Sequence, residues 1–157
     1  MGASERDNSV TISRVDVVDL PVLMPMLRAY CDFYEVDPRD DRLVALSRAL
    51  IDDPTEGEQA LARGEEGEPL GFATVYWTWQ TLYASRVGVL NDLFVVPEAR
   101  GRGVGQALIE HCRGLCRKRA ASKLVWETAV DNHTAQRLYD GIGAEKSTWL
   151  TYEIDAW

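Results

Sequence analysis

A run of alternating arginines and glycines is the stretch of this sequence best suited to chemistry. It reads Arg100-Gly101-Arg102-Gly103-Val104-Gly105, and we call it the glycine turn. Glycines let a backbone turn tightly and approach a ligand closely. At the start of a helix the first N–H groups have no internal partners and the dipole is positive, so anions bind there. Together with the two arginines, this arrangement predicts a binding site for a phosphate or pyrophosphate.

The sequence places this turn between a strand and a helix. Residues 87–96 are rich in β-branched and aromatic types and stop at Pro97, which predicts a strand. From Val104 onward apolar residues recur at helical spacing, at Val104, Leu108, Cys112 and Leu115. A P-loop is excluded because no Lys-Ser/Thr pair follows Gly105, and a dinucleotide fingerprint fails at Gln106 or Leu108.

A third pattern, Arg/Gln-x-x-Gly-x-Gly/Ala, is matched by Arg100, Gly103 and Gly105. Here the sequence resembles the GNAT N-acetyltransferases, which bind the coenzyme A pyrophosphate in this loop. The resemblance implies acetyl-CoA as co-substrate, held by the glycine turn and by the preceding strand residues, Leu93, Phe94 and Val95. The alternative is a glycine-rich connection that binds nothing.

A second segment, residues 132–144, also resembles the family. Its pattern Asn-x-x-Ala-x-x-Leu-Tyr-x-x-x-Gly is complete, with Ala144 where Phe is commoner. The resemblance implies that Asn132 contacts the pantetheine arm and that Tyr139 is the general acid beside the CoA sulfur. A buried tyrosine with a satisfied hydroxyl is the structural alternative.

The candidates for binding or deprotonating the acceptor are less specific. The run 90–95 resembles the polyamine (spermidine/spermine) and thialysine acetyltransferase branch; Asp92 matches its Asp, whereas Asn91 replaces its Glu. Asp92 is therefore a candidate base and substrate residue, with Glu127 a weaker one. Glu35, in the acidic cluster of residues 32–41, and Trp77 are candidate substrate-binding residues. A solvated turn and a packed core are the respective alternatives.

The periodicity predicts an α/β fold. We expect strands at 10–15, 59–63, 70–79, 87–96, 122–130 and 149–154, with helices from 19, 42, 104 and 132. The family resemblance implies a mixed, mostly antiparallel, seven-stranded sheet flanked by about four helices, with a splayed central strand pair. Residues 1–9 are expected to be a disordered lead, and residues 10–157 a single acetyl-CoA-binding domain.

Composition narrows the functional classes. The 157 residues carry a net charge of −8, which disfavours a nucleic-acid partner. No apolar run approaches a membrane span and no signal-peptide core is visible, so a cytoplasmic protein is expected. The three cysteines have no framework spacing, and we expect reduced thiols and no metal. Family analogy implies a homodimer.

The sequence thus predicts an enzyme that transfers acetyl from acetyl-CoA to a primary amine of a small, cationic acceptor such as a polyamine or amino acid. Two other functions stay open. One is acetylation of a protein or peptide amine, because these motifs are shared across acceptor classes. The other is a non-catalytic acetyl-CoA sensor, which the Asn91 substitution favours.

Overall fold

The computed structural model describes residues 9–157, which divide into two units, residues 9–127 and Thr128–Trp157. The first unit contains a five-stranded sheet in the order β1-β2-β3-β4-β5. Neighbouring strands pair antiparallel except β4 and β5, which are parallel, as predicted for a strand–helix–strand unit. The strands are β1 (Thr11–Arg14), β2 (Gly57–Arg63), β3 (Pro69–Gln80), β4 (Ser85–Val95) and β5 (Ala121–Val125).

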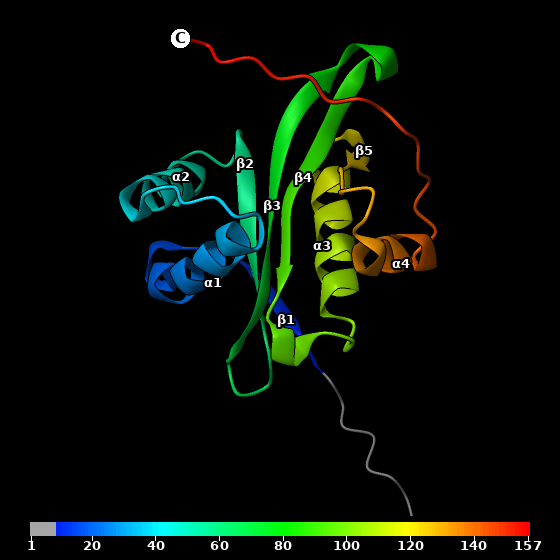
Figure 1. Cartoon of the computed structure of the whole chain (residues 1–157). Coiled ribbons are helices and arrows are strands. Elements are labelled where there is room, and N and C mark those ends of the chain that lie inside the picture. The colour runs from blue at the N-terminus through cyan, green and yellow to red at the C-terminus, as the bar shows by residue number, and fades with distance from the viewer. Residues whose placement is uncertain (1–8) are drawn as a thin grey trace, which may run out of the picture. The chain divides into compact units, whose positions relative to one another are not determined.

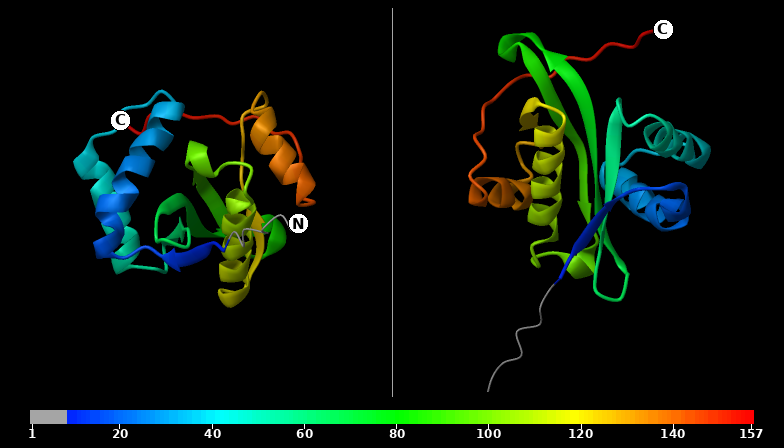
Figure 2. Two further views of the ribbon diagram at one scale, coloured as in Figure 1. Left: turned by 90° about the horizontal axis from the view of Figure 1, so that it is seen from below. Right: turned by 180° about the vertical axis from the view of Figure 1, so that it is seen from behind.

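Three α-helices cover this sheet. They are α1 (Leu20–Phe33), α2 (Asp40–Asp52) and α3 (Val104–Lys118), with short 3-10 turns η1 (Val17–Asp19), η2 (Thr81–Tyr83) and η3 (Pro97–Ala99) between elements. Figures 1 and 2 show α1 and α2 on one face of the sheet and α3 on the other. We call these the α1 face and the α3 face.

Successive side chains of β3 point alternately to the α1 face and the α3 face, so this strand contributes to the core on each side of the sheet. Phe72, fully buried, packs on the α1 face in a cluster with α1 residues such as Leu23 and Leu27. Val75 and Trp77 lie on the other face, where a Cβ on Gly88 would meet both of them and Cys116 of α3. The apolar side predicted for α3 is confirmed, since Val104, Leu108 and Cys112 are all buried. The site residues described below project from this two-sided framework.

The second unit contains α4 (His133–Gly141) followed by a segment without regular structure. The strand predicted at 149–154 is wrong: these residues form no strand, although their apolar side chains alternate with polar ones. The strand predicted at 122–130 is shorter and ends at Val125. The described chain therefore has five strands rather than seven, with the four helices expected. The predicted disordered lead lies outside the described residues, apart from Ser9.

Candidate active site

The glycine turn adopts the backbone that its composition predicts. Gly101 and Gly103 have φ values of +72° and +82°, in the left-handed region that favours glycine. Gly103 is the N-cap residue of α3, and no side chain caps this helix. A Cβ built on either glycine would meet no atom within 4 Å, so the turn presents bare backbone to open space. This arrangement leaves the first N–H groups of α3 available to an anion.

The other residues of the glycine turn differ: some anchor it to the core or to β4, and one is exposed to solvent. Val104 and Gly105 are buried and fix the first turn of α3 against the core. The guanidinium Nε of Arg100 donates to the backbone oxygen of Val95 at 3.2 Å, which ties the turn to the end of β4. Arg102 is exposed. The two arginines therefore place positive charge close to the exposed backbone of the glycine turn.

The strand that leads to this turn loses its neighbour half-way along. β4 pairs with β5 only from Arg86 to Val89, yet it continues to Val95. Because the N–H of Val96 donates to Leu70 on β3, alternation directs the backbone groups of Val95 and Leu93 to the opposite edge. Among the described residues no strand pairs with that edge. β5 ends at Val125, opposite Val89, and the splayed strand pair stays a prediction. The backbone of Leu93 and the N–H of Val95 are directed to this unpaired edge, where they could bind a ligand.

Phe94 plays a different part from its neighbours. Its ring lies on the α1 face, 5.9 Å from the ring of Phe72. It also lines an open apolar groove of about 400 Å³, together with α1 residues such as Pro25, Met26 and Ala29. The Phe94 side chain therefore packs against the core on the α1 face.

A β-bulge at Asn91 coincides with the divergence of β4 from β5. Thr74 pairs with Asp92 and Val75 with Leu90, so Asn91 has no opposite residue on β3. Bulges bend a strand and increase its twist, and this one lies two residues beyond Val89, the last residue of β4 that pairs with β5. The side-chain amide of Asn91 donates to Asp92 at 3.0 Å, and its backbone oxygen accepts from the Tyr30 hydroxyl at 3.3 Å.

Asp92 lies on the α1 face, largely buried among hydroxyl groups. Burial raises the pKa of its carboxyl above the usual value, and hydrogen bonds from Thr74, Asn91 and Tyr30 oppose that rise. Burial, followed by the charge of Asp92, also raises the pKa of Tyr30 and of Tyr76. Both phenols are therefore protonated donors at neutral pH, and Asp92 binds a proton more readily than an exposed aspartate does.

Tyr30 and Tyr76, which lie near Asp92, were not among the site residues predicted from the sequence. Tyr30 stood at helical spacing with the apolar residues of its helix, and Tyr76 alternates with Phe72 and Thr74 on one face of β3. These patterns identify a shared face, but the contact between Tyr30 and residue 91 spans 61 positions in the chain. Only the tertiary fold brings them together.

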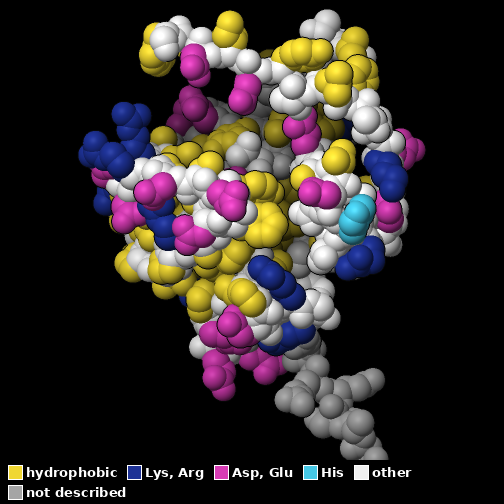
Figure 3. Space-filling view, viewed as in Figure 1, with side chains coloured by type: hydrophobic (Ala, Val, Ile, Leu, Met, Phe, Trp, Pro, Cys, Tyr) yellow, Lys and Arg dark blue, Asp and Glu magenta, His cyan; other side chains and the backbone are white. Residues whose placement is uncertain are grey.

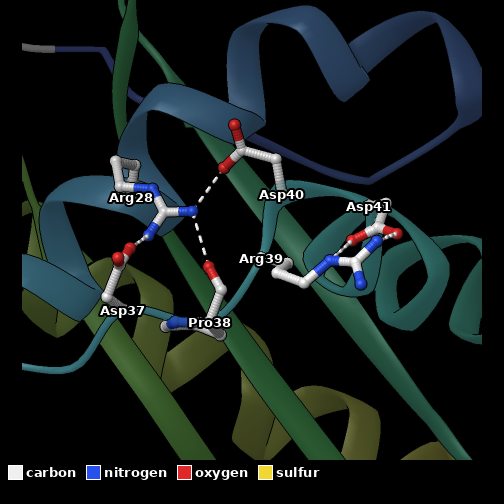
Figure 4. Close-up of polar contacts among 6 residues, drawn as sticks. All are labelled: Arg28, Asp37, Pro38, Arg39, Asp40 and Asp41. Carbon is white, nitrogen blue, oxygen red and sulfur yellow. Dashed lines mark hydrogen bonds and ion pairs between the residues drawn. The ribbon is translucent and has the colours of Figure 1, made fainter.

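Three of the five acidic residues in the cluster of residues 32–41 form ion pairs with arginines. Arg28 forms ion pairs with Asp37, at 2.9 Å, and with Asp40, while its other contact is the backbone oxygen of Pro38 (Figure 4). Arg39 and Asp41 form a further pair at 2.6 Å. Figure 3 shows acidic and basic side chains interleaved over this region. Glu35, the predicted substrate residue, is exposed just beyond α1 with φ +56°.

Trp77 lies on the opposite sheet face from Asp92. Only 8% of it is exposed, and the Arg119 guanidinium stacks 5.0 Å from its ring centre. Its neighbours are Gly88 and Cys116, where β4 meets α3. Trp77 is thus packed in the core, as in the alternative that the sequence left open, and its contact with the acceptor stays a prediction.

The second sequence motif lies in the second unit. Asn132 is the N-cap of α4, and its side-chain oxygen accepts from the N–H of Ala135 at 3.2 Å. This local role explains why an asparagine suits the position. Tyr139 is half-buried on α4. The predicted contacts of Asn132 with pantetheine and of Tyr139 with the CoA sulfur stay predictions.

Residues 9–157 contain no group of three or more His, Cys, Asp or Glu side chains arranged to hold a metal ion. None of the helices in this part of the chain combines the length and apolar content that crossing a membrane requires.

Comparison with known proteins agrees with this geometry. An uncharacterized N-acetyltransferase, YhfO, of Bacillus subtilis is 29% identical over 143 residues, covering 91% of this chain and 95% of that protein. An aminoglycoside N(6')-acetyltransferase type 1 of Stenotrophomonas maltophilia is 30% identical over 116 residues, 72% of this chain and 74% of that one. The crystal structure of a probable acetyltransferase superposes with a TM-score of 0.82 at 27% identity, covering 94% and 98% of the two chains.

The family model with the description "Acetyltransferase (GNAT) family" matches residues 23–144. That range includes the glycine turn, the open edge of β4 and the second motif. The chain belongs to the GNAT acetyltransferase family, whose acetyl donor is acetyl-CoA.

Proposed function

We propose that this enzyme transfers acetyl from acetyl-CoA directly to the primary amine of a small acceptor. The observation that carries the proposal is the continuity of β4. Its bulge presents Asp92, its unpaired edge offers the backbone of Leu93 and Val95, and its end enters the glycine turn. One strand thus offers consecutive contacts for an amine, a pantetheine arm and a pyrophosphate.

In the proposed arrangement the pyrophosphate binds the N–H groups of the glycine turn. The pantetheine arm follows the open edge of β4, with the thioester carbonyl and a pantetheine amide on the backbone of Leu93 and Val95. Asn132 provides a further pantetheine contact. The contacts assigned to Leu93 and Val95 use backbone groups whose direction follows from the strand register, so they do not depend on side-chain rearrangement.

The reaction moves three protons. An alkylammonium has a pKa near 10.4, so neutralising it at pH 7 costs about 4–5 kcal/mol. Asp92, whose pKa burial raises, accepts that proton directly or through a water. The neutral nitrogen then attacks the thioester carbon and gives its second proton to solvent, and the tetrahedral intermediate collapses to the amide with cleavage of the carbon–sulfur bond. Tyr139 gives its phenolic proton to the departing thiolate and is reprotonated from solvent.

Three observations favour a small amine as the acceptor. The run 90–95 resembles polyamine and thialysine acetyltransferases, the aminoglycoside relative has an amine substrate in its name, and Asp92 supplies an anion for an ammonium group. Glu35 is a candidate for a distal positive group. A protein or peptide amine is the second candidate acceptor. We also propose a cytoplasmic homodimer, on family analogy, and sedimentation of the purified protein tests its oligomeric part.

Release of free thiol from acetyl-CoA, measured against diamines, polyamines, amino acids, aminoglycosides and short peptides, tests the function. We expect one small amine to react, and the Tyr139→Phe variant to bind CoA normally while kcat falls about 10²- to 10⁴-fold. Tyr152→Phe, which alters an exposed tyrosine of the same unit, is the control and retains full activity. Unchanged turnover in Tyr139→Phe removes Tyr139 from the mechanism.

A comparison of two variants tests whether Asp92 is the general base. Asp92→Asn keeps the shape of the side chain and loses its proton acceptor, so we expect kcat/KM to fall and its pH profile to change. Glu127→Gln is the matched variant of the weaker candidate base and leaves the profile intact. If kcat/KM falls in Glu127→Gln and does not fall in Asp92→Asn, Glu127 is the general base and Asp92 is not.

The sensor alternative predicts binding without turnover. Thiol release that depends on an acceptor, and that disappears in Gly103→Asp, contradicts it, because the new carboxylate repels the pyrophosphate in the glycine turn. If acetyl-CoA binds and none of the amines reacts, the substitution of Asn91 for the branch's Glu becomes the leading explanation and the sensor function is favoured.

A further inference from the structure

Three tyrosines lie near Asp92 on the α1 face, and we call Asp92, Tyr30, Tyr34 and Tyr76 the Asp92 cluster. The hydroxyl of Tyr30 donates to the backbone oxygen of Asn91, the residue before Asp92, at 3.3 Å. The ring centres of Tyr30 and Tyr34 are 5.0 Å apart. Tyr76 lies on the same face of β3 as Thr74, two residues away, and Thr74 pairs with Asp92. The cluster therefore combines one carboxylate with several aromatic rings.

The aromatic surface extends from the cluster to solvent. Tyr34 is 48% exposed, and the ring of Phe33, 64% exposed, lies 5.0 Å from it. The Tyr34 ring packs against Tyr30, and the Tyr30 ring packs against the buried Phe72, yet about half of Tyr34 and most of Phe33 face solvent. A ligand held at Asp92 would have aromatic surface beside it.

The acidic residues of the cluster 32–41 would contribute little to the binding of a second ammonium group on the acceptor. Asp37, Asp40 and Asp41 already have arginine partners. Asp32 and Glu35 are exposed, and an ion pair in that setting contributes at most about 1 kcal/mol in measured cases. Asp92 differs because it is largely buried, where a charge–charge attraction is screened less.

We propose that the Asp92 cluster selects an acceptor with one ammonium group on an apolar or aromatic body, in preference to a polyamine. The inference rests on the proposed N-acetyltransferase function and specifies its acceptor class. Asp92 binds the ammonium, and the rings of Tyr30, Tyr34 and Tyr76 contact the adjacent carbons and the cation. A second ammonium group would have to lose hydration beside aromatic rings without gaining a buried anion.

Equilibrium binding to the full chain saturated with CoA tests this inference without requiring turnover. The ligands are 2-phenylethylamine, hexylamine, putrescine and spermidine. We expect the two monoamines to bind at least about tenfold more tightly than the two polyamines at physiological salt. Equal or tighter binding of spermidine overturns the proposal.

Variants locate the selectivity in the cluster. Asp92→Asn, which preserves side-chain shape, should weaken binding of 2-phenylethylamine by about tenfold or more. Tyr34→Ala should weaken it about three- to tenfold, as expected for loss of one aromatic contact with a cation. Tyr83→Ala, at a tyrosine of similar exposure (45%) on the β3–β4 connection, is the control and leaves it unchanged. Equal effects of Tyr34→Ala and Tyr83→Ala contradict the assignment.

The same ligands separate this inference from the function on which it rests. Thiol release with spermidine as the preferred acceptor retains the N-acetyltransferase function and rejects the monoamine class. Selective binding of the monoamines with no thiol release from acetyl-CoA retains the ligand class and rejects catalysis.

Discussion

Adding a single methyl group at Gly103 separates the backbone strain of the glycine turn from its ligand-binding role. Gly103 has φ +82° and its Cβ position is empty, so an alanine there meets no protein atom. Gly67, in the turn between β2 and β3, has φ +79° and an equally empty Cβ position. Gly103→Ala and Gly67→Ala therefore carry the same backbone change at two sites, only one of which is proposed to bind CoA.

The expected magnitudes differ between stability and binding. An L-residue in the left-handed region costs about 1–2 kcal/mol, so both variants should lose that amount of unfolding free energy. For a chain of this size each kcal/mol lowers the melting temperature by about 2–4 °C. At Gly103 the methyl also occupies the space through which a pyrophosphate reaches the helix N–H groups. Losing one charge-assisted hydrogen bond, worth about 1.5–3 kcal/mol, weakens CoA binding about ten- to a hundredfold.

Denaturant unfolding and calorimetric titration with CoA measure the two effects on the same samples. We expect a similar drop in stability for both variants and a loss of CoA affinity for Gly103→Ala alone. If Gly103→Ala binds CoA as tightly as the unmodified protein, the pyrophosphate does not contact this turn. A parallel loss of affinity in Gly67→Ala would show that strain, rather than steric exclusion, is being measured.

Three further predictions concern the framework around the site. Gly88→Ala places a Cβ 2.6 Å from the Cys116 sulfur, so it should destabilise the fold by about 1–3 kcal/mol, and adding Cys116→Ala should recover part of that loss in a double-mutant cycle of denaturant unfolding. Burial raises the pKa of Asp92 above 3.8, so its contribution to stability is complete below pH 3.8 and is lost as the pH rises through the higher, folded-state value. Asp92→Asn lacks that loss, so its unfolding free energy relative to the unmodified protein should increase from acid to neutral pH, and a constant difference contradicts the burial of the charge. Burial also raises the pKa of the Cys112 thiol to about 12, so thiol reagents at pH 8 should modify it at the rate of global unfolding, and rapid modification of the native protein contradicts its position.

The sequence predicted best where a local pattern and a local backbone requirement coincide. Residues 100–105 specify a tight turn because glycine tolerates positive φ, and the residues from Val104 onward specify a helix through their spacing. Both were therefore readable without tertiary information. The parallel pairing of β4 and β5 also follows locally, since a helix between two strands carries the chain back to the starting edge.

The remaining features depend on contacts that no local pattern encodes. The alternation at 149–154 shows that the segment could form a strand, but a strand requires a hydrogen-bonded neighbour, which these residues lack. The role of Trp77 depends on which sheet face α3 covers. The contact of Tyr30 with Asn91 depends on how α1 docks on the sheet. Motif spacing made Asp92 a candidate site residue, but it could not point to the tyrosines near it.

The bulged residue of β4, Asn91, decides which sheet face each of the residues after it points to. Without it, residues 90 and 92 would point the same way, as alternate residues of any regular strand do. With it, Leu90 stays opposite Val75 on the α3 face while Asp92 stays opposite Thr74 on the α1 face. The orientation of Asp92 is thus encoded by the number of residues in β4 as well as by their identity. A change in strand length of one residue would therefore be a more severe mutation here than almost any substitution.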